Sequence, residues 1–250
     1  MTASHAPSTV LRNLLDPTRL SGQASDEQGF LDLVTDAGTG RRTIAQRAME
    51  NRALARIYEK VWRPAFTRAF SFGGTATRSH TNGIIDKLRT RNAGLILDVA
   101  CGPGLHTRQL ADGADGFVIG LDLSIPMLRE AVRSTTSEHV AYLRTDAHDL
   151  PFADDTFDAA CCLAALYLIP DPHRVIDEMI RVLKPGGILA IFTSADVKLA
   201  RLPLVKPTLS RVGGLNVFGR DEITSTLRRS GFTEISHEIA GQGQFITARK

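Results

Sequence analysis

The fold of this chain follows from one short segment, Ile96-Leu97-Asp98-Val99-Ala100-Cys101-Gly102-Pro103-Gly104. Its apolar residues predict a buried strand that ends at Val99, and a helix is expected to begin after Gly104. Glycines in the turn let the backbone approach a ligand closely. The amides at the helix start favour an anionic group such as a carboxylate, and ligands of open α/β sheets bind at this end of the strands.

Strand-like and helix-like segments alternate from Gly94 onward. The predicted strands are Leu95–Val99, Gly116–Leu121, Val140–Arg144, Phe157–Leu163 and Gly187–Thr193. Predicted helices begin after Gly104, at Ile125, at Pro172 and at Asp221. This alternation predicts a parallel, doubly wound sheet. Strands near Thr233–His237 and Gln244–Ala248 add an antiparallel hairpin, so we expect an α/β, Rossmann-like fold with a seven-stranded, mostly parallel sheet.

The glycine turn fits neither of two common nucleotide-binding patterns. A dinucleotide turn has three glycines, but Thr107 stands where the third belongs, and the Gly-Lys-Ser/Thr of a phosphate-binding loop is absent. Asp98 would repel a pyrophosphate and suits the ammonium of an amino acid. Asp122 ends the second strand, where a carboxylate accepts both hydroxyls of a ribose. The alternative role of Asp122 is to cap the next helix, which Ser124 could do equally.

Five segments in order carry a family resemblance. They are Asp98–Gly104; Asp122; Arg144-Thr145-Asp146-Ala147 with Leu150-Pro151-Phe152; Phe157-Asp158 with Leu166-Tyr167-Leu168-Ile169-Pro170-Asp171; and Leu183-Lys184-Pro185-Gly186-Gly187. Together they resemble the class I S-adenosylmethionine-dependent methyltransferases, in the type 11 branch that includes the quinone-biosynthesis enzymes. Ala100 replaces the usual first glycine of the first motif, which related members tolerate.

The resemblance implies S-adenosyl-L-methionine as cofactor and S-adenosyl-L-homocysteine as product. Asp98 and the glycine-turn amides would hold the methionine part, Asp122 the ribose, and Asp146 the adenine amino group. Met127 would pack near the adenine and Leu163 would line the cofactor, with an ordinary core position as an equal alternative for both. The implied set in this region is Asp98, Ala100, Cys101, Gly102, Gly104, Asp122, Leu123, Met127, Asp146, Ala147, Leu163 and Ala164.

The rest of the chain is expected to frame this domain, which spans residues 91–250 and includes a substrate-cap insertion over 194–220. Residues 1–42 are predicted to form a partly ordered extension whose short apolar pieces dock on the larger body. Residues 43–90 are predicted to form a helical lid, with a loop over 71–80 and a helix from Asn82 to Arg89.

A fainter resemblance concerns a zinc-ribbon module found in some relatives. Gly29-Phe30-Leu31-Asp32-Leu33 resembles the end of that module, and the segment Tyr58–Arg63 resembles the helix after it. Residues 1–100 contain no cysteine, so this module would be metal-free. By the same resemblance, Tyr58 and Trp62 would close over the cofactor.

Composition narrows the classes of partner. The net charge is only +3, and the N-terminal arginines are spaced like a solvated helix face rather than a phosphate-binding stripe. Cys101, Cys161 and Cys162 form no C-x-x-C pair, so we expect no metal site, and their odd number fits a reducing compartment. No apolar run approaches the roughly 20 residues that span a bilayer. We expect a cytoplasmic monomer or homodimer with neither a nucleic-acid partner nor stable membrane insertion.

Methyl transfer is an in-line displacement at a sulfonium carbon, so alignment of the acceptor supplies much of the rate. A base is needed only when the acceptor must lose a proton. Tyr167, where many relatives have a histidine, is expected at the active-site mouth, where it would orient the acceptor; packing is the alternative. His106 is the best-placed histidine, with a structural role as its alternative. Apolar residues in the lid and cap favour a small, partly apolar acceptor.

Two other functions remain compatible with these residues. The same pocket could use the bound sulfonium as an electrostatic aid to another reaction, such as a cyclisation. The chain could also be a non-catalytic partner subunit, although a dead pocket has no physical need of two aspartates. Only turnover to S-adenosylhomocysteine separates methyl transfer from the first of these alternatives.

Overall fold

A computed structural model describes residues 7–20, 24–26, 28–34, 75–88, 94–112, 116–195 and 216–250. Its eight-stranded sheet has the order β1-β4-β3-β2-β5-β6-β8-β7. The strands are β1 (Leu31–Asp32), β2 (Leu95–Val99), β3 (Phe117–Asp122), β4 (Val140–Arg144), β5 (Phe157–Leu163), β6 (Leu183–Ser194), β7 (Thr233–Ala240) and β8 (Gly243–Arg249). The first six in sheet order are parallel, whereas β8 runs antiparallel to β6 and to β7. The expected seven strands and C-terminal hairpin are confirmed, and β1 adds a short edge strand.

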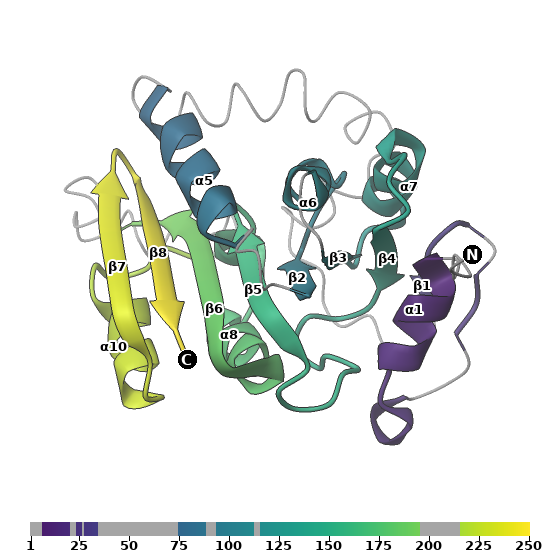
Figure 1. Cartoon of the computed structure of the whole chain (residues 1–250). Coiled ribbons are helices and arrows are strands. Elements are labelled where there is room, and N and C mark those ends of the chain that lie inside the picture. The colour runs from purple at the N-terminus through teal and green to yellow at the C-terminus, as the bar shows by residue number, and fades with distance from the viewer. Residues whose placement is uncertain are drawn as a thin grey trace.

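Helices cover both faces of the sheet (Figure 1). On one face, α5 (Thr75–Leu88), α6 (Leu105–Ala111) and α7 (Ile125–Ser134) bury apolar side chains such as Ile84, Leu110 and Leu128. On the other face lie α1 (Pro7–Leu14), α8 (Pro172–Val182) and α10 (Glu222–Arg229), whose buried residues join a second cluster. Because β2 to β6 are covered on both sides, their sequences are continuous apolar runs rather than alternating ones.

Two sequence expectations about element bounds need correction. Residues 75–80 were expected in a loop, but α5 begins at Thr75, directly after the Gly73-Gly74 pair. Tertiary packing explains this, because the buried Ile84, Ile85 and Leu88 anchor the helix and override the low helix propensity of its Ser/Thr-rich start. The fifth predicted strand starts at Leu183 rather than Gly187, because Leu183 already pairs with Phe157 of β5.

The N-terminal segment packs on the sheet through apolar residues. Leu11 and Leu31 are fully buried and Phe30 is 2% exposed. Leu31 of β1 pairs in parallel with Leu143 of β4, and a single bridge joins Leu15 to Phe152. The predicted lid over residues 43–90 and the cap over 194–220 fall largely outside the described residues. Within the parts that are described, no helix is long and apolar enough to cross a bilayer.

A buried ion pair fixes this segment to the end of β4. Arg144 Nη1 lies 2.9 Å from Asp32 Oδ2 and 3.3 Å from Asp32 Oδ1, and the two side chains are 9% and 16% exposed. Arg144 Nε also donates to the carbonyl oxygen of Leu123 at 3.1 Å. One guanidinium therefore joins three segments that are far apart in sequence.

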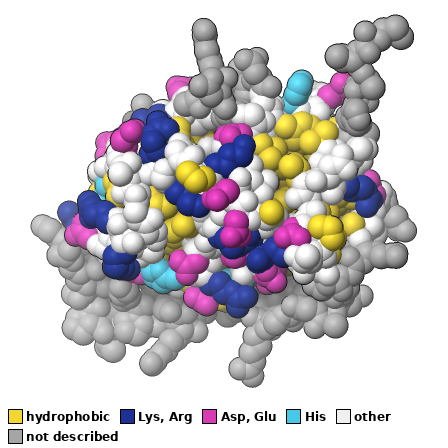
Figure 2. Space-filling model, turned by 60° about the horizontal axis from the view of Figure 1, so that its bottom comes forward, with side chains coloured by type: hydrophobic (Ala, Val, Ile, Leu, Met, Phe, Trp, Pro, Cys, Tyr) yellow, Lys and Arg dark blue, Asp and Glu magenta, His cyan; other side chains and the backbone are white. Residues whose placement is uncertain are grey.

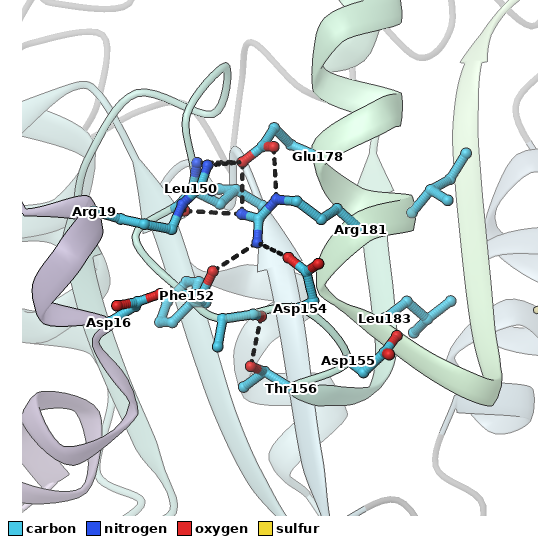
Figure 3. Close-up of polar contacts among 12 residues, drawn as sticks. Asp16, Arg19, Leu150, Phe152, Asp154, Asp155, Thr156, Glu178, Arg181 and Leu183 are labelled. Carbon is cyan, nitrogen blue, oxygen red and sulfur yellow. Dashed lines mark hydrogen bonds and ion pairs between the residues drawn. The ribbon is translucent and has the colours of Figure 1, made fainter.

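A second polar cluster ties the segment to the loop after β4 (Figure 3). The 3-10 turn η1 (Pro17–Arg19) ends in Arg19, whose Nε donates to the carbonyl of Leu150. Arg181 of α8 donates to the carbonyls of Leu150 and Phe152 and pairs with Glu178, which also accepts from Arg19. This cluster holds the Leu150–Phe152 segment on both sides. Figure 2 shows one face of the molecule, on which acidic and basic side chains are interspersed.

We predict that Asp32→Asn lowers the free energy of unfolding by about 3 kcal/mol, because it leaves the buried Arg144 cation without its counter-ion. Urea unfolding measures this change. Asp26→Asn is the matched control in the same segment, since Asp26 pairs with Arg12 at 3.6 Å between side chains that are 31% and 44% exposed. That control should cost less than about 1 kcal/mol. Equal effects of both substitutions would contradict the assignment.

Candidate cofactor site

The turn after β2 has the strained backbone that its sequence suggests. Three of its residues have positive φ: Ala100 at 56°, Gly102 at 57° and Gly104 at 78°. A Cβ on Gly104 would lie 2.4 Å from the hydroxyl oxygen of Tyr142, so only glycine fits there. A Cβ on Gly102 would meet no atom within 4 Å. The turn is therefore packed from below at Gly104 and open at Gly102, where a ligand can approach the backbone.

Asp98 points a buried carboxylate at this turn. It is 1% exposed, accepts a hydrogen bond from the Thr107 hydroxyl at 2.7 Å and has the Cys161 thiol 3.6 Å from its other oxygen. The pKa of Asp98 is raised to about 6, mainly by burial and to a lesser extent by the neighbouring Asp122, although the hydrogen bonds from Thr107 and Cys161 lower it. Among the described residues, no lysine or arginine forms an ion pair with it. The Asp98 carboxylate therefore has hydrogen-bond donors but no counter-ion in the described part of the chain, and a cationic group of a ligand could provide one.

Asp122 closes the turn from the next strand. Its Oδ2 accepts the backbone N–H of Gly102 at 2.8 Å, and its Oδ1 accepts that of Ser124 at 2.8 Å. Ser124 is the residue that caps α7, through the amide of Met127. The capping role considered for Asp122 thus belongs to Ser124. Asp122 remains partly exposed, burial raises its pKa, and its carboxylate contacts the start of α7 only through the Ser124 amide.

Asp146 follows β4 with an exposed side chain, and its Oδ1 accepts from the backbone N–H of His148 at 3.0 Å. The His148 ring lowers the pKa of Asp146. Ala147 beside it is buried, as are Met127 and Leu163, while Ala164 holds a φ of 66°. Leu123 is partly exposed.

The predicted cofactor residues that are described lie at the carboxyl ends of neighbouring parallel strands. The strand order β4-β3-β2-β5 brings four residues at or next to the strand ends to one edge of the sheet: Asp146, Asp122, Asp98 and Leu163. Tyr58 and Trp62 lie outside the described residues. The roles of all these residues in binding stay predictions, but their common edge is the edge at which open α/β sheets bind ligands.

The two candidate catalytic residues have less open surroundings. Tyr167 lies in the 3-10 turn η4 (Leu166–Leu168), is 4% exposed and packs in the apolar core, and its carbonyl accepts from the amide of Asn216. The expected mouth position therefore carries a buried side chain. His106 lies on α6 with Nδ1 3.0 Å from the Gln109 side-chain oxygen. Their catalytic roles remain untested predictions.

Sequence reasoning missed three residues that build the site. Thr107 counted only as a missing glycine, yet its hydroxyl is the donor to Asp98. Tyr142 supports the turn from β4, and its hydroxyl lies 2.8 Å from Thr135 Oγ1. Gly120 is needed because a Cβ there would lie 2.8 Å from the Tyr142 ring. A glycine inside a strand is itself a sign of close approach, so Gly120 was the available signal.

Comparisons with known proteins agree with this geometry. A family model described as a methyltransferase domain matches residues 97–191. An uncharacterized chloroplastic methyltransferase of Arabidopsis thaliana is 29% identical over 90% of this chain and 67% of its own length. A demethylmenaquinone methyltransferase of Listeria welshimeri is 32% identical over 63% of this chain and 68% of its own length. For other curated relatives, the match spans about half of their length.

A solved structure, the 4+2 cyclase SpnF, has a TM-score of 0.64 at 21% identity, covering 85% of this chain and 97% of that chain. This likeness concerns the fold.

Two glycine substitutions should separate folding from binding. Gly104→Ala places a methyl group against Tyr142 and should lower the free energy of unfolding by about 2 kcal/mol or more. Gly102→Ala faces open space and should cost only about 1 kcal/mol from its positive φ, while weakening S-adenosylhomocysteine binding at least tenfold. Calorimetric titration and urea unfolding measure both effects. Unchanged affinity in Gly102→Ala would show that the ligand does not lie against this turn.

Asp98→Asn should stabilise the free protein at neutral pH. The raised pKa of Asp98 means that its contribution to stability is complete below pH 3.8 and is lost as the pH rises to about 6. Asparagine has no such loss, so the variant should exceed wild type by about 2 kcal/mol at pH 8 and match it near pH 4. Affinity for S-adenosylmethionine should fall in the same variant. Thermal unfolding across this pH range checks the sign, and a variant less stable than wild type at pH 8 would refute it.

Proposed function

Because this chain belongs to the class I S-adenosylmethionine-dependent methyltransferases, we propose that it transfers the cofactor's methyl group to a small, partly apolar acceptor. The observation that carries the proposal is the buried Asp98 carboxylate at the open glycine turn, with Asp122 one strand away. A carboxylate that lacks a cation suits the ammonium of an amino acid. A second carboxylate 24 residues later in the chain suits the hydroxyls of a ribose.

The same residues support a mechanism based on positioning. Asp98 would hold the ammonium of the cofactor and Asp122 its ribose, and the bound cofactor would supply a sulfonium whose methyl group an aligned acceptor can attack. The sulfonium is already a good leaving group, so in-line attack by an aligned acceptor atom needs little further chemistry from the chain. A general base is required only for acceptors that must lose a proton.

Apolar side chains pack near the ends of β5 and β6, which favours an apolar acceptor. Leu166, Tyr167 and Phe218 are at most 4% exposed in this region. Two hydrogen bonds join Asn216 to this region. The Asn216 backbone amide donates to the Tyr167 carbonyl, and the Asn216 side-chain amide donates to the Ile169 carbonyl. The relatives named demethylmenaquinone methyltransferases are named for an apolar ring substrate, which favours the same class.

A cyclisation that uses bound S-adenosylmethionine without consuming it is the alternative that the likeness to SpnF favours. The two differ in one product, S-adenosylhomocysteine.

Calorimetric titration with S-adenosylmethionine and S-adenosylhomocysteine tests the binding half of the proposal. We expect micromolar affinity in wild type and a loss of at least tenfold in Asp122→Ala, which removes both a ribose contact and the tie to Gly102. Asp112→Ala, at the exposed C-terminal cap of α6, should bind as wild type does. Absence of binding by folded wild-type protein would reject the cofactor assignment.

Acceptor screening tests the reaction half. A panel of small phenols, quinols and carboxylic acids, each incubated with the protein and S-adenosylmethionine, should yield S-adenosylhomocysteine with at least one member. Cofactor-dependent conversion of a substrate without this product would favour the cyclisation instead.

A further inference from the structure

His148 bridges two parts of the site that the sequence does not connect. Its Nδ1 lies 2.5 Å from Oδ1 of Asp146, and its Nε2 lies 2.5 Å from the backbone carbonyl oxygen of Pro170. Asp146 is the predicted adenine-binding residue. Pro170 ends the Tyr167–Pro170 segment, which begins within η4. One imidazole ring therefore spans the cofactor side and the acceptor side of the site.

The geometry requires a charged ring. Both ring nitrogens face oxygen atoms that only accept hydrogen bonds, because Asp146 is ionised and the Pro170 oxygen is a carbonyl. A neutral imidazole carries one N–H and can satisfy only one of them, whereas the imidazolium donates to both. Charge-assisted hydrogen bonds of this kind are short and roughly twice as strong as neutral ones.

The surrounding charges agree with that protonation state. The hydrogen bond to Asp146 is the main reason that the pKa of His148 lies above 6.5; partial burial opposes it, and Asp171 adds to the rise. On the opposite side, Arg174 of α8 donates through Nε to the His148 backbone carbonyl. Two carboxylates and one guanidinium thus face His148 from its own loop and from the start of α8, so the net field favours the cation.

The bridge leaves one oxygen of Asp146 available. Oδ1 accepts from both the ring and the backbone N–H of His148. No described residue donates to Oδ2 of Asp146. With Oδ1 held, the carboxylate is fixed in one orientation, and Oδ2 is the atom left to accept the adenine amino group.

We propose that His148 is a positioning residue, whose protonated ring orients Asp146 toward the adenine and fastens the Tyr167–Pro170 segment beside it. The inference rests on the proposed function, since it needs a bound adenine. Loss of the proton breaks one of the two ring hydrogen bonds, so the ring can no longer hold Asp146 and the Tyr167–Pro170 segment together. The contribution of the bridge to cofactor affinity is therefore full below pH 6.5 and is lost as the pH rises through the raised pKa of His148.

The effect of His148 is isolated by dividing the dissociation constant of the variant by that of wild type at the same pH. Titration of the ligand and of Asp98 changes both constants equally and therefore cancels in this ratio. For S-adenosylhomocysteine, the ratio for His148→Ala should be about five to ten at pH 6.5 and should approach one at pH 9. His148→Gln, which keeps a single donor and does not titrate, should give a smaller ratio. His173→Gln is the matched control, because His173 pairs with Glu222 on the surface, and its ratio should stay near one throughout.

Nuclear magnetic resonance of the His148 ring tests the bridge without relying on catalysis. Asp146→Asn should lower the pKa of His148 toward 6.5 in the free protein. In wild type, saturating S-adenosylhomocysteine should raise the pKa of His148, because a ligand that binds the protonated form more tightly must also favour that form. A ratio that is independent of pH, with wild type still binding the ligand, overturns this inference alone. Absence of ligand binding by wild type overturns the proposed function together with it.

Discussion

The site depends on a carboxylate placed where water cannot reach it. Asp98 lies on β2, which pairs with β3 on one side and with β5 on the other. The backbone of Asp98 is therefore held in place by both neighbouring strands. Its donors are one hydroxyl and one thiol, and neither carries charge. Burying an ion in this way is unfavourable until an opposite charge arrives. The ionised Asp98 therefore lowers the stability of the free protein while it raises the affinity for a cationic ligand.

The other parts of the site follow from that placement. The turn over Asp98 must hold Ala100, Gly102 and Gly104 at positive φ, and Asp122 fastens it by accepting the Gly102 amide. Tyr142 fills the space beneath, which excludes a side chain at both Gly104 and Gly120. Asp122 thus shapes the turn with the same carboxylate that is predicted to accept the ribose hydroxyls. A substitution there changes the backbone of one ligand-binding segment as well as its own contact.

Local sequence patterns predicted the strands of the sheet because their apolar runs and turn residues are decisive at short range. The strands at Val140–Arg144 and Phe157–Leu163 were predicted to the residue. Contacts across the chain were beyond such patterns. The hydroxyl of Thr107 meets Asp98, and His148 meets Pro170, only once the sheet has formed. Asp158 shows the same limit: its motif resembles a functional one, yet here it accepts the amide of Leu95 and pairs with Lys184, which joins β5 to the start of β2.

The end of β4 is where the N-terminal segment acts on the site. Arg144 pairs with Asp32 of that segment and also donates to the carbonyl of Leu123, the residue after Asp122. Two residues beyond Arg144, Asp146 is held by His148. Arg19 and Arg181 fix the following Leu150–Phe152 segment from the other direction. The matched family region begins at residue 97, so residues 7–34 lie outside it. Through Arg144 they reach the carbonyl of Leu123, next to the predicted ribose-binding Asp122, and through Arg19 they reach Leu150, which follows the predicted adenine-binding Asp146.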